Sequence, residues 1–369
     1  MRPFARALRP VAVCIGVLGM MLAGLGCRSA TLAIPASPGA QENRLQYAGL
    51  ERSYWVVAAA GESSRPVVLA LHGGGGTAAA MCRMRGGLQD LARQGAYILV
   101  CPQGVENHWN DGRQITGWRA HTENIDDVGF LAAVVEDVAK DYSVDLQRVF
   151  ATGISNGGQM SYRLACERGD LVRAIAPVAA SMAETLECAP ARPVSVAILN
   201  GVADPLVPYG GGWIGFGGDR LGRVIATEEA WRRWAELNQC SGEPEPVWLP
   251  DRSPDDGTRT QLLSRSGCAE GTQVLLYRIE GGGHTWPSGP QYLPEWVVGR
   301  VSQDLDGSQL IWDFFEAQPV EAEREPTTPG DHLVTANGFR ERLQPRSESR
   351  RLERRSQFLS TAAIRQAWR

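Results

Sequence analysis

One pentad constrains this chain more than any other stretch: Gly-Ile-Ser-Asn-Gly at residues 153–157, which places Ser155 in a G-x-S-x-G frame. An apolar run at residues 148–152 precedes it, and a stretch of helical character at residues 158–166 follows it. A strand, a tight turn and a helix in that order are the setting of a nucleophilic serine. Glycine is favoured on both sides because larger side chains would collide with backbone in so sharp a turn. The alternative is an ordinary strand-to-helix turn in which Ser155 caps the helix.

A nucleophilic serine needs a base that takes its proton and an acid that orients the base. His284 lies on the glycine-rich segment 280–287, directly after an apolar run. Asp204 also follows an apolar run. The order Ser155, Asp204, His284 is the chain order of the α/β-hydrolases, not of the other serine hydrolase lineages. The alternatives are a histidine that fills a loop and an aspartate that forms a turn before Pro205.

A glycine run follows the buried strand expected at residues 67–71 and begins with His72. Backbone amides in such a loop can face a negatively charged oxygen. We expect oxyanion donors at Gly74 or Gly75 and at Asn156, and we expect His72 to be structural rather than a second base. The competing interpretation is a phosphate-binding loop, but the lysine of the Walker motif is absent from the run.

These motifs together resemble bacterial extracellular esterases of the polyhydroxybutyrate depolymerase type, a group that also contains feruloyl esterases of carbohydrate esterase family one. The resemblance covers most of the chain, from about residue 52 to residue 315. The matching stretches are LALHGGGG (69–76), NHWNDGR (107–113), the block 125–167, AIAPVAA (174–180), NGVADPLVPYGGG (200–212) and GGGHTWPSG (281–289).

The resemblance implies an α/β fold of the α/β-hydrolase type, with a mostly parallel central sheet flanked by helices, and hydrolysis of carboxylic esters without a cofactor. It implies Ser155 as the nucleophile, Asp204 as the acid and His284 as the base. The chain departs from the family in a longer glycine-rich insert at residues 211–222 and in a charged C-terminal extension. These departures leave open whether the substrate is a short polyhydroxyalkanoate oligomer or a feruloyl or acetyl polysaccharide ester.

The N-terminus has the features of an export signal, a basic start followed by an apolar run at residues 11–25. Cys27 follows Gly-Leu-Gly, which resembles a bacterial lipobox whose cysteine is lipidated. We therefore expect an extracellular or cell-envelope protein, either attached to a membrane through Cys27 or freely secreted. The expected division is a signal at residues 1–27, a flexible tether at 28–44, a catalytic domain at 45–317 and a charged, disordered extension at 318–369.

Export permits disulfides, and six cysteines remain beyond the signal. Their number alone leaves many pairings open. The family resemblance and chain proximity favour Cys166–Cys188 and Cys240–Cys268, which leaves Cys82–Cys101. Metal binding is the alternative use of cysteine, but no C-x-x-C spacing supports it.

Tryptophans are the candidates for substrate contact. Trp213 lies on the glycine-rich loop 209–222 that follows Asp204, so it either lines the cleft, where it suits an aromatic or hydrophobic acyl group, or packs on the domain surface. Trp109, Trp118 and Trp286 are further candidates for the cleft wall.

Strands are expected at residues 47–58 (a pair), 67–71, 96–100, 149–152, 174–178, 194–199 and 274–279, and helices at 88–93, 127–142, 227–238 and 308–316. Strands that alternate with helices favour a parallel sheet. Thr227 is expected to cap its helix. Asp126 and Asp127 suggest either a metal site or the preference of helix N-termini for acids, and we favour the second.

The net charge of −4 and the lack of a basic block in the core region argue against a nucleic-acid partner. Two other function classes remain: an acyltransferase that uses the same three residues, and a non-catalytic surface-binding protein on the same fold. From the serine, histidine and aspartate motifs and the family resemblance, the expected partner is an ester substrate.

Overall fold

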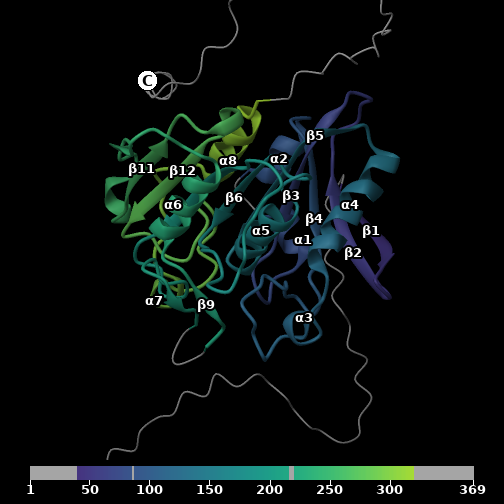
Figure 1. Cartoon of the computed structure of the whole chain (residues 1–369), viewed down its shortest axis with the longest axis horizontal. Helices are drawn as coiled ribbons and strands as arrows, with labels where there is room; N and C mark the ends of the chain where they lie inside the picture. The colour runs from purple at the N-terminus through teal and green to yellow at the C-terminus, as the bar shows by residue number, and fades with distance from the viewer. Residues whose placement is uncertain (1–39, 85–86, 216–219, 320–369) are drawn as a thin grey trace, which may run out of the picture. The chain divides into compact units, whose positions relative to one another are not determined.

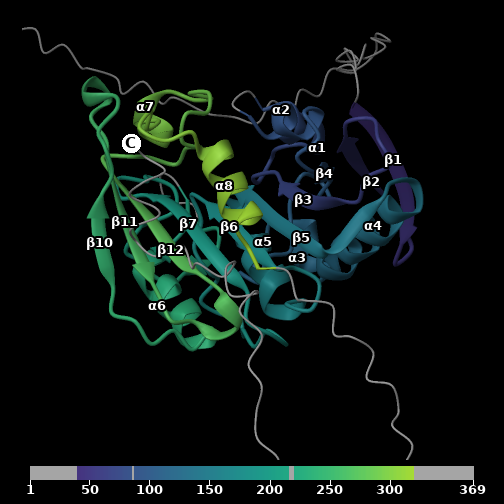
Figure 2. The same cartoon turned by 90° about the horizontal axis from the view of Figure 1, so that it is seen from above.

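A ten-stranded mixed sheet organises the protein, which we describe from a computed structural model over residues 40–84, 87–215 and 220–319. Its strands are β1 (Ala40–Tyr47), β2 (Leu50–Val57), β3 (Arg65–Leu71), β4 (Ile98–Pro102), β5 (Val144–Ile154), β6 (Ala174–Val178), β7 (Ser195–Gly201), β10 (Glu245–Trp248), β11 (Arg259–Arg265) and β12 (Val274–Glu280). The order across the sheet is β1-β2-β4-β3-β5-β6-β7-β12-β11-β10 (Figures 1 and 2). The six central strands, β4, β3, β5, β6, β7 and β12, run parallel to one another. The antiparallel strands β2 and β1 extend the sheet beyond β4, and the antiparallel strands β11 and β10 extend it beyond β12.

Helices cover both faces of this sheet. One face carries α1 (Ala78–Cys82), α2 (Leu88–Arg93) and α8 (Gly307–Glu316), and the other carries α4 (Asp127–Asp141), α5 (Asn156–Glu167) and α6 (Thr227–Leu237) (Figure 2). Two short helices, α3 (Arg119–Thr122) and α7 (Glu295–Val298), lie outside these layers. A small antiparallel pair is formed by β8 (Gly212–Trp213) and β9 (Arg223–Val224). This topology is the α/β-hydrolase fold, so the expected fold is confirmed.

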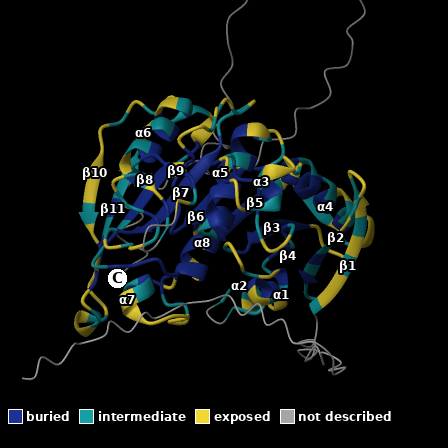
Figure 3. Cartoon of the chain, turned by 90° about the horizontal axis from the view of Figure 1, so that it is seen from below, coloured by how far each residue is buried: buried dark blue, intermediate teal, exposed yellow. Residues whose placement is uncertain are grey.

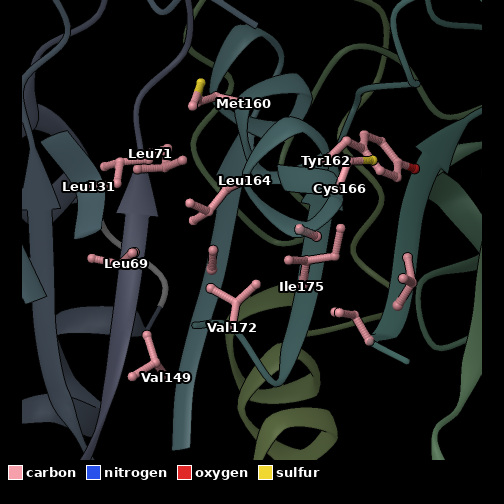
Figure 4. Packing of buried hydrophobic residues seen from close by; sticks show 14 of the residues in the cluster. Leu69, Leu71, Leu131, Val149, Met160, Tyr162, Leu164, Cys166, Val172 and Ile175 are labelled. Atoms are coloured by element: carbon pink, nitrogen blue, oxygen red, sulfur yellow. The ribbon is translucent and has the colours of Figure 1, made fainter. Parts of the chain in front are cut away.

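Strands β3, β4, β6 and β7 are buried along their whole length, and β5 is buried over residues 149–153, because helices shield both faces of the sheet there (Figure 3). Leu69 and Leu71 of β3 belong to one buried cluster with Leu164 of α5 and Ile175 of β6 (Figure 4). Strands β5, β7 and β12 lead out of this core to Ser155, Asp204 and His284.

Three disulfides link Cys82–Cys101, Cys166–Cys188 and Cys240–Cys268. All three expected pairings are confirmed. Each closes a loop of about 20 to 30 residues, a constraint worth on the order of 3 kcal/mol in the chain-entropy description.

Two expectations need correction. The opening strand pair begins at Ala40, so residues 40–44 belong to β1 and not to a tether, because they pair with residues 53–57 of β2. Thr227 begins α6 but does not cap it: the N-cap is Ala226, and the Thr227 hydroxyl instead accepts a hydrogen bond from Asn200 Nδ2 at 2.8 Å.

The export signal, Cys27, most of the tether and nearly all of the C-terminal extension lie outside the described residues. Within the part of the chain that the structure describes, no helix has the length and apolar character needed to cross a membrane.

Candidate active site

Ser155 lies in the sharp turn between β5 and α5. Its backbone has φ 56° and ψ −122°, a conformation that residues other than glycine rarely adopt. A Cβ atom on Gly153 would lie 2.6 Å from the carbonyl oxygen of Leu71, and one on Gly157 would overlap the same oxygen. The two glycines are therefore required by close backbone contact with β3.

The side chain of Ser155 does not cap the helix. Ser155 occupies the N-cap position of α5, but its hydroxyl makes no capping hydrogen bond. The first amide that donates to its carbonyl is that of Gln159, at 2.9 Å. The amides of the first helical turn therefore point beyond the helix end without an intrahelical acceptor.

His284 and Asp204 form a buried hydrogen-bonded pair. His284 Nδ1 lies 2.7 Å from Asp204 Oδ2, and the two side chains are 4% and 3% exposed. The other carboxylate oxygen of Asp204 accepts the amides of Leu206 and Val207, both at 2.8 Å. Because an ionised carboxylate only accepts hydrogen bonds, Nδ1 carries the proton and Nε2 is left as the basic nitrogen.

The sheet brings the three predicted residues to one edge. Ser155, Asp204 and His284 follow the carboxyl ends of the parallel strands β5, β7 and β12, which lie within four neighbouring positions of the sheet. The loops after β7 and β12 touch through their backbones, where the Ala203 amide donates to the Gly282 carbonyl at 2.9 Å. Figure 1 shows α3, α7 and β9 at this same end of the sheet. Carboxyl ends of parallel strands are where such folds bind ligands.

The glycine run after β3 passes beside the serine. A Cβ atom on Gly73 would lie 3.6 Å from Ser155 Cβ. Gly75 has φ +75° and donates its amide to the Asn107 carbonyl at 2.9 Å, which fixes the loop. Gly74 lies against Trp118, whose ring packs at a tilt of 31° on that of His108, with centroids 4.0 Å apart.

His72 holds the base of this glycine loop. Its Nδ1 lies 2.9 Å from the Gly73 carbonyl, and its Nε2 accepts the Gly104 amide at 3.0 Å. Burial lowers the pKa of His72 to about 4, so the ring is neutral at pH 7. These contacts confirm the structural role expected for His72.

The residue after the serine is tied to a buried ion pair that the sequence did not single out. The Asn156 side chain accepts the Trp109 amide at 2.8 Å and donates to Asp111 Oδ2 at 2.5 Å. Arg113 pairs with Asp111 at 2.7 Å and donates to the Leu221 carbonyl at 2.8 Å. The pair thus links the serine turn to the glycine-rich insert. The only sequence signal for it was the NHWNDGR stretch.

The sequence resembles those of known esterases. No known family profile matches the chain. A protein named "Putative esterase NocK" from Nocardia uniformis subsp. tsuyamanensis is 32% identical over 282 residues, which cover 72% of this chain and 80% of that protein. The chain belongs to this esterase family.

A second relative is also named as an esterase. Feruloyl esterase C of Emericella nidulans is 35% identical over 61% of this chain and 66% of that protein. Among solved structures, an acetyl xylan esterase from Aspergillus awamori aligns with a TM-score of 0.48 at 16% identity, over 75% of this chain and 99% of that one. The family assignment rests on the sequence relatives, and it makes the protein a carboxylic ester hydrolase.

Two of the tryptophans proposed for substrate contact in this esterase are buried. Trp109 is fully buried and donates its indole N–H to a backbone carbonyl at 3.0 Å, and Trp286 is 2% exposed with its indole N–H on a serine hydroxyl at 3.2 Å. Their assignment as substrate-binding residues was wrong, because neither side chain has surface to offer. Trp213 is 44% exposed, with the guanidinium groups of Arg220 and Arg223 over its ring at 5.1 and 5.5 Å.

The paired aspartates of the esterase are explained by α4. Asp126 is the N-cap of this helix and accepts the Gly129 amide at 2.8 Å. Asp127 is buried and pairs with Arg52 at 2.7 Å. The preference for a helix N-terminus over a metal site is confirmed for Asp126 by this capping bond.

Proposed function

We propose that this protein is a serine esterase in which Ser155 is the nucleophile, His284 the base and Asp204 the acid. The observation that carries the proposal is the buried His284–Asp204 pair, 2.7 Å apart, at the sheet edge that also presents the Ser155 turn. A histidine oriented by a carboxylate, at the same end of the sheet as a serine on a strained turn, is the kind of arrangement that acyl transfer uses.

The reaction proceeds in two halves. Nε2 of His284 takes the proton of the Ser155 hydroxyl as its oxygen attacks the ester carbonyl, and the amides of Gly74 and Asn156 hold the oxyanion. The alcohol leaves with the proton from His284, which yields an acyl-enzyme. Water, deprotonated by the same nitrogen, then attacks the acyl-enzyme; the bond to Ser155 Oγ breaks, that oxygen takes back the proton from His284, and the acid is released. Asp204 stabilises the imidazolium in both halves.

Two substrate classes fit the proposal: feruloyl or acetyl esters of polysaccharides, and short polyhydroxyalkanoate oligomers. The relatives named feruloyl esterases support the first class. The partly exposed stack of Trp118 and His108 above Gly74 also suits a planar acyl group, since it lies beside the proposed oxyanion loop.

We further propose that the protein is exported, through the signal at residues 1–27, to the cell envelope or the medium. The three disulfides support this, because such bonds persist in oxidising compartments. Lipidation at Cys27 is tested by Cys27→Ser: a lipoprotein would shift from the membrane fraction to the soluble fraction, whereas a freely secreted protein would not change its distribution.

The decisive experiment measures hydrolysis of p-nitrophenyl acetate and butyrate, methyl ferulate and hydroxybutyrate oligomers by the oxidised protein and by Ser155→Ala. We expect kcat to fall by at least about 10³-fold in the variant with the thermal midpoint unchanged. Equal activity of the two proteins would refute the serine mechanism. Activity only when an alcohol or sugar acceptor is added would instead indicate an acyltransferase, and no activity with any ester would favour a binding protein.

A further inference from the structure

A short segment after His284, residues 291–299, gathers exposed apolar side chains; we name it the strap. Among the described residues, six large hydrophobic side chains are exposed, and three of them lie on the strap. These are Tyr292 at 48%, Leu293 at 45% and Trp296 at 69% exposure. Half of the exposed large hydrophobic side chains of the described residues thus lie within five positions of one short segment, and exposed apolar side chains that gather in one place are candidates for a binding surface.

The strap is fixed to the backbone of His284. The Tyr292 hydroxyl donates to the His284 carbonyl at 2.9 Å, and the His284 amide donates to the Val298 carbonyl at 2.5 Å. Gln291 Nε2 donates to the Gly299 carbonyl at 3.1 Å, which ties the two ends of the strap together. The exposed side chains are therefore carried by a segment whose place relative to the base is set by several hydrogen bonds.

The chemistry of the proposed mechanism says which part of an ester lies near this segment. The base returns its proton to the oxygen of the leaving alcohol, so the alcohol part lies on the His284 side. The carbonyl oxygen faces Gly74 and Asn156. The strap, which is bonded to the backbone of His284, thus adjoins the alcohol part of the substrate.

We propose that the strap is a binding platform for the sugar residues of a saccharide ester, with Trp296 and Leu293 in direct contact and Tyr292 as a positioning residue. The inference rests on the proposed serine esterase function. Sugar rings present C–H faces that stack on aromatic rings and hydroxyl edges that need polar partners. The strap and its C-terminal neighbour supply both, because Glu295, which directly precedes Trp296 in the chain, is paired with Arg300 at 3.7 Å and each of these side chains is more than half exposed. A purely apolar alcohol would gain nothing from these charges.

The test compares two esters of the same acid, methyl ferulate and a feruloylated arabinoxylan oligosaccharide. In Trp296→Ala we expect KM for the saccharide ester to rise about tenfold, with kcat/KM for methyl ferulate within about twofold of the unaltered protein. Trp248→Ala is the matched control, because Trp248 is 48% exposed on the edge strand β10. It should change neither value. Leu293→Ala should shift KM in the same direction by a smaller factor.

A direct binding measurement separates recognition from catalysis. Unesterified arabinoxylan oligosaccharide should quench the tryptophan fluorescence of Ser155→Ala, and the quenching should weaken about tenfold when Trp296→Ala is added. Equal losses on both esters, or no change on either, would overturn the platform while the esterase function stands. Inactivity of the unaltered protein on both esters would overturn the proposed function and the platform with it.

Discussion

In the proposed mechanism the serine turn and the strap serve one site, yet they are built in opposite ways. The turn is packed so tightly against β3 that its glycines leave no room for a Cβ atom. The strap carries side chains that are about half exposed or more, and it is held by a few hydrogen bonds. The difference teaches that bond-making chemistry is placed where added atoms are not tolerated, and that selectivity is placed where side chains can be exchanged without repacking the core.

The largest expected effect is at the serine turn, where the packing is tightest. In Gly157→Ala, the new Cβ would overlap the backbone oxygens of Leu71 and His72. We expect the free energy of unfolding to fall by at least about 4 kcal/mol, or folded protein to be lost. Urea unfolding followed by circular dichroism measures this. Gly210→Ala is the matched control, since its Cβ would meet nothing within 4 Å. A stable Gly157→Ala protein would show that the turn is looser than we describe.

The next effect concerns chemistry without loss of fold. Asp204→Asn keeps an oxygen that can accept the Leu206 and Val207 amides, but it no longer supplies a carboxylate to His284. We expect kcat for p-nitrophenyl acetate to fall about 10⁴-fold while the thermal midpoint changes little. Full activity in this variant would remove Asp204 from the proposed mechanism.

A third prediction uses pH to probe the base of the glycine loop. The pKa of His72 is lowered from 6.5 to about 4 by burial, so the unfolded chain binds the proton more readily than the folded one. The contribution of His72 is therefore fully present above about pH 6.5, and it is lost as pH falls towards about 4, for a total of about 3 kcal/mol.

Urea unfolding at pH 7, 6 and 5 measures that loss, with His72→Gln as the comparison. The pKa values of His108 and His121 are also lowered by burial, so the difference between the two proteins isolates His72. A glutamine does not titrate, and the variant should lose less stability on acidification. Parallel pH curves for the two proteins would contradict the assigned cause.

The same contrast separates what the sequence predicted from what it did not. The strand–turn–helix geometry at Ser155 and the places of Asp204 and His284 after strands were predictable, because each motif is a local run of strand, glycine and polar residue, whereas their catalytic roles stay a proposal. The burial of Trp109 and Trp286 was not, because the contacts that cover them come from distant segments. The Asp111–Arg113 pair was missed for the same reason: its partners lie on the serine turn and on the glycine-rich insert.

The edge strands show a further limit. β10 and β11 were not predicted, because they are short or partly exposed and lack the continuous apolar run that marks the central strands. β1 was placed too late along the chain, since its exposed alternation of polar residues resembles a tether until its pairing with β2 is seen.

The smallest expected effect lies where the two regions meet, at the Tyr292 hydroxyl. Tyr292→Phe keeps the ring on the strap but removes the hydrogen bond to the His284 carbonyl. One such bond contributes about 1 kcal/mol, so we expect kcat to fall about fivefold, equally for methyl ferulate and the saccharide ester. Burial and the charge of Asp204 raise the pKa of the Tyr292 hydroxyl, which therefore remains a donor across the working pH range. The loss should accordingly be independent of pH.

Tyr209→Phe is the matched control for that variant, because its hydroxyl donates to the Glu228 side chain, at 3.3 Å, and not to the backbone of His284. It should leave both esters unaffected. A loss in Tyr292→Phe confined to the saccharide ester would assign the hydroxyl to sugar binding instead of to the base. Because Trp296→Ala is expected to discriminate between the two esters and Tyr292→Phe is not, the pair of variants divides the strap into a face that binds substrate and a hydroxyl that holds the base.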